Sequence, residues 1–229
     1  MDQTKITVKI YKPLLRDFDR QIDSLFIKRD AFLNNIVRGQ VHYLSRDLEG
    51  KRMSSDSKRY VSGQLKRMGT VAINVVVDKS TADALNEVVE RTNIVRDAFF
   101  NRLILFLRSS DALLNYLDLP KFVTPSGFSA VVDPMPTSPM KAMEEVQADP
   151  LFYLREAVSE RYQTGLYLID LPRQLMGFSC YLEESKVPGT EAHAQAQREA
   201  AEADAMLDEL LSFEADAFRK PATVKGAKP

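Results

Sequence analysis

The sequence predicts a mainly α-helical protein whose N-terminal half contains two copies of one strand–helix–helix unit. Residues 5–37 align without a gap on residues 72–104 when the chain is shifted by 67 positions. Each copy opens with apolar residues at every second position, which is the period of a strand. Two stretches with helical spacing of apolar residues follow in each copy. A repeat of this kind indicates that each copy buries its apolar face against the other.

The alternating segments predict one strand per copy, each with one buried and one outward face. The apolar faces carry Ile6, Val8 and Ile10 in the first copy and Ile73, Val75 and Val77 in the second. The opposite, outward faces carry Lys5, Thr7 and Lys9 in the first copy and Ala72, Asn74 and Val76 in the second.

Two helices are expected after each strand. Pro13 suits the first turn of the first helix, where its missing N–H costs nothing. In the second copy, Ser80 and Asp83 have the spacing of a capping pair. The second helices are expected over residues 28–43 and 95–108. Both begin near the same Arg-Asp-Ala-Phe segment, and both carry an asparagine two residues beyond it.

One unit of roughly forty residues is too small to close a core alone, and a lone strand leaves its backbone groups unpaired. The two strands are therefore expected to pair as an antiparallel ribbon above four helices. In this arrangement residues 4–45 and 70–108 resemble the ribbon-helix-helix family, which includes the Arc and methionine repressors. Arg29 and Arg96 match the arginine near the start of that family's second helix, and Asn93 stands where a glycine is usual. Phe26, Lys28 and Val95 depart from the family's pattern.

The resemblance implies a pseudo-dimer in which two diverged units pair within one chain. Exchange of units between two chains is an alternative that the sequence leaves open. The resemblance also implies that the ribbon enters the major groove of DNA, which admits two strands. The side chains expected to contact bases are Lys5, Thr7, Lys9, Ala72, Asn74 and Val76. The alternative is that these residues form only the solvated face of a strand.

Phosphate contacts are expected at the N-termini of the second helices, where free N–H groups favour an anion. The candidates there are Lys28, Arg29, Asn93 and Arg96. For the two arginines, ion pairs with Asp30 or Asp97 are the alternative.

The segment 46–69 is expected to be a mobile basic linker that follows the DNA backbone or enters the minor groove, or else a solvated connector without contacts. Its candidate phosphate-binding residues are Lys51, Arg52, Lys58, Arg59, Lys66 and Arg67. The charge distribution agrees with a nucleic-acid role for this half. Residues 1–110 carry a formal charge of +7, whereas residues 111–229 carry −8.

The expected segments are unit 1 over 1–45, the linker over 46–69, unit 2 over 70–110, a helical domain over 111–189, and a terminal helix with tail over 190–229. No family is recognised in residues 111–229. Helices are expected over 111–119, 140–147 and 151–162, with a proline-rich loop over 120–140. The apolar run 165–182 is too interrupted to span a bilayer and is expected to be a buried turn followed by a helix. The helix over 190–218 either folds onto its own domain or binds a partner, and the tail 220–229 is expected to be disordered.

Enzymatic and metal-binding functions are not favoured by the sequence. The chain has two histidines and one cysteine, so no zinc-binding cluster and no disulfide framework can be assembled. No cofactor is expected. The first repeat begins at once, which predicts no signal peptide, and the single cysteine agrees with a reducing cytoplasm.

The expected function is that of a cytoplasmic, sequence-specific binder of double-stranded DNA. A transcriptional regulator, such as a repressor, is the favoured role, with residues 111–218 available for self-association and the C-terminal helix for a protein partner. Two alternatives remain: an accessory DNA-binding protein at a plasmid-transfer origin, and an antitoxin-like protein-interaction module without independent DNA binding.

Overall fold

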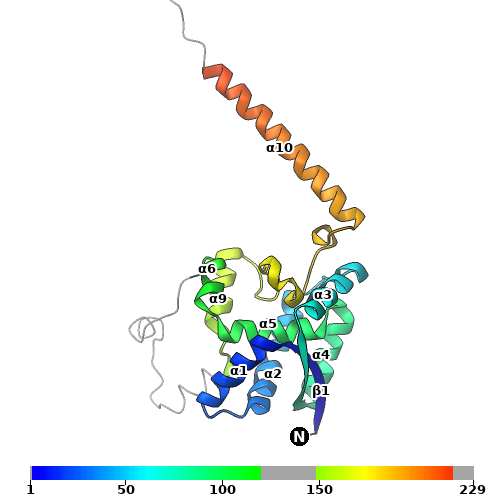
Figure 1. Cartoon of the computed structure of the whole chain (residues 1–229), viewed down its shortest axis with the longest axis vertical. Coiled ribbons are helices and arrows are strands. Elements are labelled where there is room, and N and C mark those ends of the chain that lie inside the picture. The colour runs from blue at the N-terminus through cyan, green and yellow to red at the C-terminus, as the bar shows by residue number, and fades with distance from the viewer. Residues whose placement is uncertain (1, 120–147, 219–229) are drawn as a thin grey trace, which may run out of the picture. The chain divides into compact units, whose positions relative to one another are not determined.

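The computed structural model of the chain describes residues 2–119 and 148–218, and this part is mainly helical (Figure 1). It forms two compact units, Met1–Glu183 and Glu184–Pro229. In the first unit the order is β1 (Gln3–Tyr11), α1 (Lys12–Ser24), α2 (Arg29–Asp47), α3 (Ser55–Arg67), β2 (Thr70–Asp78), α4 (Lys79–Thr92), α5 (Arg96–Arg108), α6 (Asp111–Tyr116), α9 (Phe152–Tyr162) and the 3₁₀ helix η1 (Arg173–Phe178). Three expected segments lie outside the described residues: the loop over 120–140, the helix over 140–147 and the tail over 220–229.

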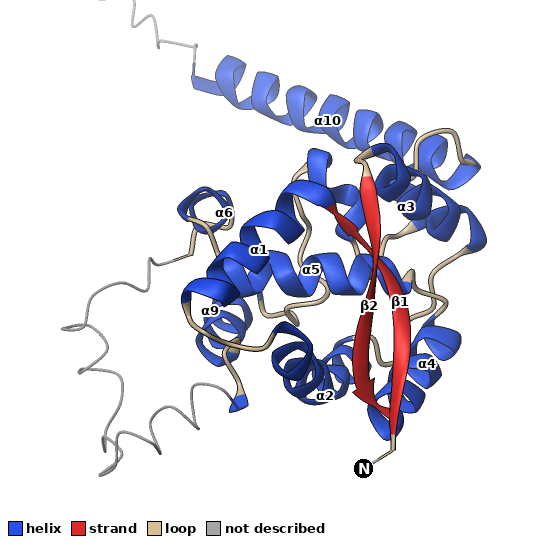
Figure 2. Cartoon of the chain, turned by 60° about the horizontal axis from the view of Figure 1, so that its bottom comes forward, coloured by secondary structure: helices blue, strands red, loops and turns tan. Residues whose placement is uncertain are grey.

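The two predicted strands pair with each other as an antiparallel ribbon (Figure 2). Thr7 lies opposite Asn74, and these two residues are also equivalent positions of the sequence repeat. The register is therefore symmetric under the repeat: Lys5 lies opposite Val76, and Lys9 lies opposite Ala72. The prediction of a mainly helical protein with a two-stranded antiparallel sheet is confirmed.

The helices bury the inner face of the ribbon in an exchanged pattern. α2 packs on β2 and α5 packs on β1, so each strand lies against the second helix of the other copy. The first helices follow the same rule, since α1 packs against α5 and α4 packs against α2. Val8, Ile10, Val75 and Val77 are fully buried in this core. Burial of such side chains is the main contribution that holds the two copies together.

The repeated asparagine of each second helix binds the outer edge of the other copy's strand. Asn101 on α5 accepts a hydrogen bond from the Tyr11 backbone N–H (2.8 Å) and donates one to the Lys9 carbonyl (2.8 Å). Asn34 on α2 accepts the equivalent bond from the Asp78 backbone N–H (2.9 Å). These crossed bonds satisfy edge groups that a two-stranded sheet would otherwise leave unpaired.

The turns between first and second helices have the same backbone conformation in the two copies. Phe26 has φ +56° and Asn93 has φ +57°, which is the left-handed region. Asn tolerates this region, as expected for Asn93, whereas the Phe26 side chain is 97% exposed. At the helix starts, Pro13 lies in the first turn of α1 as predicted. The predicted capping pair of α4 does not form, because the helix begins at Lys79 and Asp78 is its N-cap, without a side-chain cap bond.

The connector differs from the expected mobile loop, because residues 55–67 form α3. Ser54 caps this helix by accepting a hydrogen bond from the Ser57 backbone N–H (3.1 Å). Val61 and Leu65, one helical turn apart, are buried together with Ser57. The composition of this segment, rich in Ser, Gly, Lys and Arg, favours a loop. Burial of Val61 and Leu65 stabilises a helix there instead.

Gly177 of η1 packs directly against α3. A Cβ atom at Gly177 would lie 2.7 Å from the Leu65 backbone nitrogen and 2.8 Å from its Cα, so the backbone would have to move. We expect Gly177→Ala to lower the free energy of unfolding by about 1–3 kcal/mol. Gly63→Ala, on α3 with no atom within 4 Å of the added Cβ, is the matched control. Gly63→Ala is expected to stabilise the helix by up to about 1 kcal/mol. If the two variants changed the free energy of unfolding equally in urea denaturation, the packing argument would be contradicted.

The C-terminal part of the first unit is joined to α5 by a buried arginine. Arg102 is 1% exposed and donates hydrogen bonds to the carbonyls of Leu166 (2.9 Å) and Ile169 (2.5 Å). The Tyr167 ring lies against Phe99, and its hydroxyl donates to the Gln40 side chain (3.0 Å). These contacts explain why the described residues up to 183 belong to the same compact unit as the repeats, whereas a separate domain was expected from residue 111.

Burial in this cluster raises the pKa of the Cys180 thiol to about 12. The unfolded chain releases this proton above about pH 9, while the folded chain keeps it up to about pH 12. In this window the folded state binds more protons, so the free energy of unfolding is expected to fall as the pH rises, by up to about 1.4 kcal/mol per pH unit from this group. Cys180→Ala should remove this part of the slope in urea denaturation between about pH 8 and about pH 10.5. An unchanged slope would contradict it.

The second unit contains the 3₁₀ helix η2 (Glu184–Lys186) and the long helix α10 (Glu191–Phe218). Thr190 precedes α10, and its hydroxyl accepts a hydrogen bond from the His193 backbone N–H (3.1 Å). The helix predicted over 190–218 is therefore present. Of the helices described in either unit, none has the length and apolar character needed to cross a bilayer.

Candidate nucleic-acid interface

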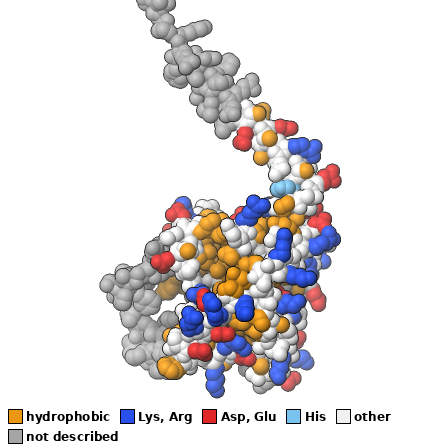
Figure 3. Space-filling view, viewed as in Figure 1, with side chains coloured by type: hydrophobic (Ala, Val, Ile, Leu, Met, Phe, Trp, Pro, Cys, Tyr) orange, Lys and Arg blue, Asp and Glu red, His pale blue; other side chains and the backbone are white. Residues whose placement is uncertain are grey.

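The outward face of the ribbon brings together all six residues predicted to contact bases. Five of them are exposed and the sixth, Val76, is half-buried. They form three facing pairs across the two strands: Lys5 with Val76, Thr7 with Asn74, and Lys9 with Ala72. Figure 3 shows lysine and arginine side chains over the flank of the molecule that carries the strands and α3. On β1 this face carries a lysine on each side of Thr7. On β2 the residues opposite these lysines are small or apolar.

A hydrogen bond joins the two side chains at the centre of this face. The Thr7 hydroxyl donates to the Asn74 side-chain oxygen (2.9 Å). The Asn74 oxygen retains a second lone pair and its amide group retains two N–H donors. The bond therefore orients the Asn74 side chain, which can still form hydrogen bonds with a ligand.

The two arginines near the second-helix N-termini have partners within the protein. Arg96 donates to the Thr7 backbone carbonyl (2.8 Å), on the outer edge of β1. Arg29 forms ion pairs with Asp30 (3.1 Å) and Asp19 (3.7 Å). Asp97, in the first turn of α5, accepts a hydrogen bond from the Lys9 backbone N–H (3.1 Å). Carboxylates in these first turns offset the positive helix end that would attract a phosphate.

Three further candidate phosphate-binding residues hold the connector against α4. Asn93 donates to the Met53 carbonyl (2.9 Å) and accepts a hydrogen bond from the Lys58 ammonium group (2.9 Å). Arg52 donates to the carbonyls of Glu90 and Arg91 near the C-terminus of α4. Cations satisfy the last carbonyls of a helix and interact favourably with its dipole. These side chains therefore have structural contacts, and their phosphate contacts stay a prediction.

The remaining connector cations and Lys28 lie on the surface. Lys51 stacks on the Tyr181 ring at 5.1 Å, and Arg59 pairs with Asp56 at 2.9 Å. Lys28, Lys66 and Arg67 are exposed, and their side chains form no hydrogen bond or ion pair with other residues in the described ranges.

Lys12 was not singled out from the sequence. It is exposed at the start of α1, directly after the strand, and its backbone N–H donates to the Gly69 carbonyl (3.2 Å). The signal available in the sequence was its position one residue before Pro13, where the predicted strand must end.

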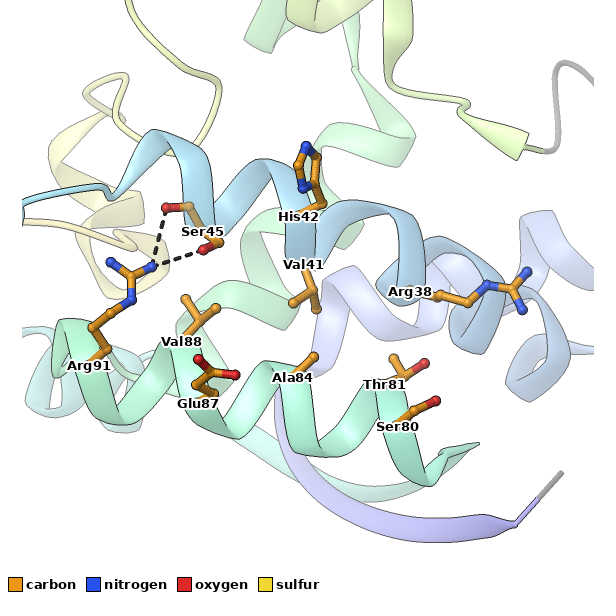
Figure 4. Close-up of a pocket in the computed structure, with 10 residues that line it drawn as sticks. All are labelled: Arg38, Val41, His42, Ser45, Ser80, Thr81, Ala84, Glu87, Val88 and Arg91. Carbon is orange, nitrogen blue, oxygen red and sulfur yellow. Dashed lines mark hydrogen bonds between the residues drawn. The ribbon is translucent and has the colours of Figure 1, made fainter.

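A separate hollow of about 340 Å³ lies between α2 and α4 (Figure 4). Arg91 crosses it from α4 to α2 and donates to the Ser45 hydroxyl (2.9 Å). Its lining combines two arginines with Glu87, so its charge favours no single class of ligand. Among residues 2–119 and 148–218, no group of three or more His, Cys, Asp or Glu side chains is placed to hold a metal ion.

No family model, curated protein or solved structure matches the chain.

Proposed function

We propose that the chain binds double-stranded DNA through the outward face of its ribbon, as a tandem ribbon-helix-helix protein whose two units pair within one chain. The observation that carries this proposal is the alternating ribbon itself. One face is buried, and the other presents Lys, Thr, Lys and Asn side chains in register on both strands. A two-stranded ribbon has the width that the major groove accepts.

The symmetric register supports the pseudo-dimer. The strands pair about the equivalent residues Thr7 and Asn74, and the asparagines of the two second helices bind the opposite strands at equivalent backbone N–H groups. At these two asparagines the diverged copies make equivalent contacts with each other, as two identical subunits would.

The chemistry of the six outward side chains favours a non-palindromic site. Lys5 and Lys9 suit the acceptor groups of guanine, and Asn74 suits adenine. Ala72 and Val76 suit the methyl group of thymine. Because both lysines lie on β1, the two halves of the bound sequence should differ.

We further propose a role in transcriptional regulation, with residues 111–218 serving in assembly or partner recruitment. An accessory role at a plasmid-transfer origin uses the same interface and would be distinguished by the origin of the bound sequence. In the third proposal, an antitoxin-like interaction module, the ribbon contacts no DNA.

The test is selection of bound duplexes from a random-sequence DNA library, followed by titration of the selected duplex at several salt concentrations. Phosphate contacts should give a linear fall of log affinity with log salt, with a slope of about −0.9 per contact. Lys5→Ala and Asn74→Ala should each relax base preference by about 1–3 kcal/mol. Lys79→Ala, an exposed cation at the start of α4, is the control and should leave base preference unchanged.

Unchanged preference in both ribbon variants would rule out base contacts by the ribbon. An absence of DNA binding, or a response that does not depend on salt, would instead favour the protein-interaction module.

A further inference from the structure

The last turn of α3 is held beside one end of the ribbon. α3 is fixed by its buried residues Val61 and Leu65 and continues through Gly69 directly into β2. The Lys12 backbone N–H donates to the Gly69 carbonyl, next to the terminal strand pair of Tyr11 and Thr70. Figure 2 shows α3 beside the end of the ribbon that lies away from the N-terminus.

Four exposed cations gather at this end of the ribbon: Lys9, Lys12, Lys66 and Arg67. The segments that carry them contain no acidic residue, since neither residues 3–16 nor residues 57–77 include Asp or Glu. From another element, Asp97 on α5 accepts a hydrogen bond from the Lys9 backbone N–H. At the opposite end, Asp78 and Asp2 lie beside Lys79. The two ends of the ribbon therefore differ in charge.

We propose that Lys12, Lys66 and Arg67 bind the phosphate backbone of duplex DNA beyond one end of the ribbon, and so extend the contact on that side only. This inference rests on the proposed function. Phosphate contacts carry no base information but fix the position and orientation of a protein on the duplex. We call these three residues the α3 clamp. Because the clamp lies at one end of the ribbon only, it would determine which way round the protein binds a DNA site whose two halves differ.

The residues of the last α3 turn also have a second effect, because cations near a helix C-terminus interact favourably with its dipole. This effect acts on the stability of α3 and is independent of DNA. The experiment therefore measures the unfolding of each variant as well as its binding.

The test compares two double variants that each remove two positive charges. One is Lys66→Ala with Arg67→Ala, and the matched control is Arg20→Ala with Lys79→Ala, whose side chains are also exposed and are not candidate DNA contacts. The probe is the duplex selected from the random library by the wild-type chain. The measurements are the salt dependence of affinity, phosphate protection by footprinting, and urea denaturation.

For the Lys66/Arg67 variant we expect the slope of log affinity against log salt to become shallower by about 1.8, which is two contacts at about 0.9 each. Protected phosphates should disappear on one flank of the site, while base preference stays unchanged. The control variant should retain both flanks and the wild-type slope.

Equal slopes and footprints for the two variants would overturn the clamp and leave the proposed function standing, provided that the ribbon variants alter base preference. Loss of protection on both flanks would also overturn it. If the wild-type chain binds no duplex, the proposed function fails and the clamp fails with it.

Discussion

Asn101→Ala is expected to lower the free energy of unfolding by about 3 kcal/mol. The Asn101 side chain is fully buried and holds both the Tyr11 N–H and the Lys9 carbonyl on the outer edge of β1. Alanine would leave these two backbone groups without partners, and each buried unsatisfied group costs about 1–3 kcal/mol. Chemical denaturation gives the total effect, and hydrogen exchange at the Tyr11 amide reports the loss at the strand.

Asn86→Ala is the matched control for this prediction, because Asn86 is exposed on α4. It should change stability by no more than about 0.5 kcal/mol. Asn34→Ala should cost less than Asn101→Ala, since Asn34 is only half-buried. If the Tyr11 amide exchanged at the wild-type rate in Asn101→Ala, the bond across the two copies would not be a stabilising contact.

Arg102→Ala is expected to lower the free energy of unfolding by about 3–5 kcal/mol and to release the segment 164–182 from α5. The substitution leaves the Leu166 and Ile169 carbonyls without a donor and opens a cavity beside Phe106, whose ring the guanidinium contacts. Desolvation lowers the pKa of Arg102, which shows that burying this charge itself opposes folding. Arg102→Met, which fills the volume without a charge, should therefore lose less stability than alanine.

The labelling rate of Cys180 by a thiol reagent measures local release of the segment. Cys180 is fully buried, so wild-type labelling requires opening of this region. Arg102→Ala should label faster, whereas Arg16→Ala, an exposed arginine on α1, should label at the wild-type rate. Equal rates in all three proteins would show that Arg102 does not hold the segment.

The ribbon and its outward face were predictable because they depend on local periodicity. Alternation of Ile6, Val8 and Ile10 assigns each side chain to a face without knowledge of the rest of the fold. The repeat then supplied the partner strand. Because a strand has only two faces, the two-residue period was enough to assign every candidate base-contacting residue to the outward face of the ribbon.

The structural roles of the cationic candidates could not be predicted, since their partners are backbone atoms distant in sequence. Arg96 binds the carbonyl of Thr7, and Arg52 binds carbonyls of α4. Charge alone does not distinguish such contacts from phosphate binding. α3 was missed for a related reason: Val61 and Leu65 are its only large buried aliphatic side chains in the structure, and their partner, η1, lies more than a hundred residues later.

The covalent link between β1 and β2 has a consequence for dilute solutions. Two separate subunits that share a ribbon dissociate when their concentration falls below the dissociation constant. The two strands of this chain remain at a high effective concentration set by the connector, whatever the amount of protein present. The ribbon should therefore stay assembled at vanishing abundance, and its melting temperature should not change on dilution.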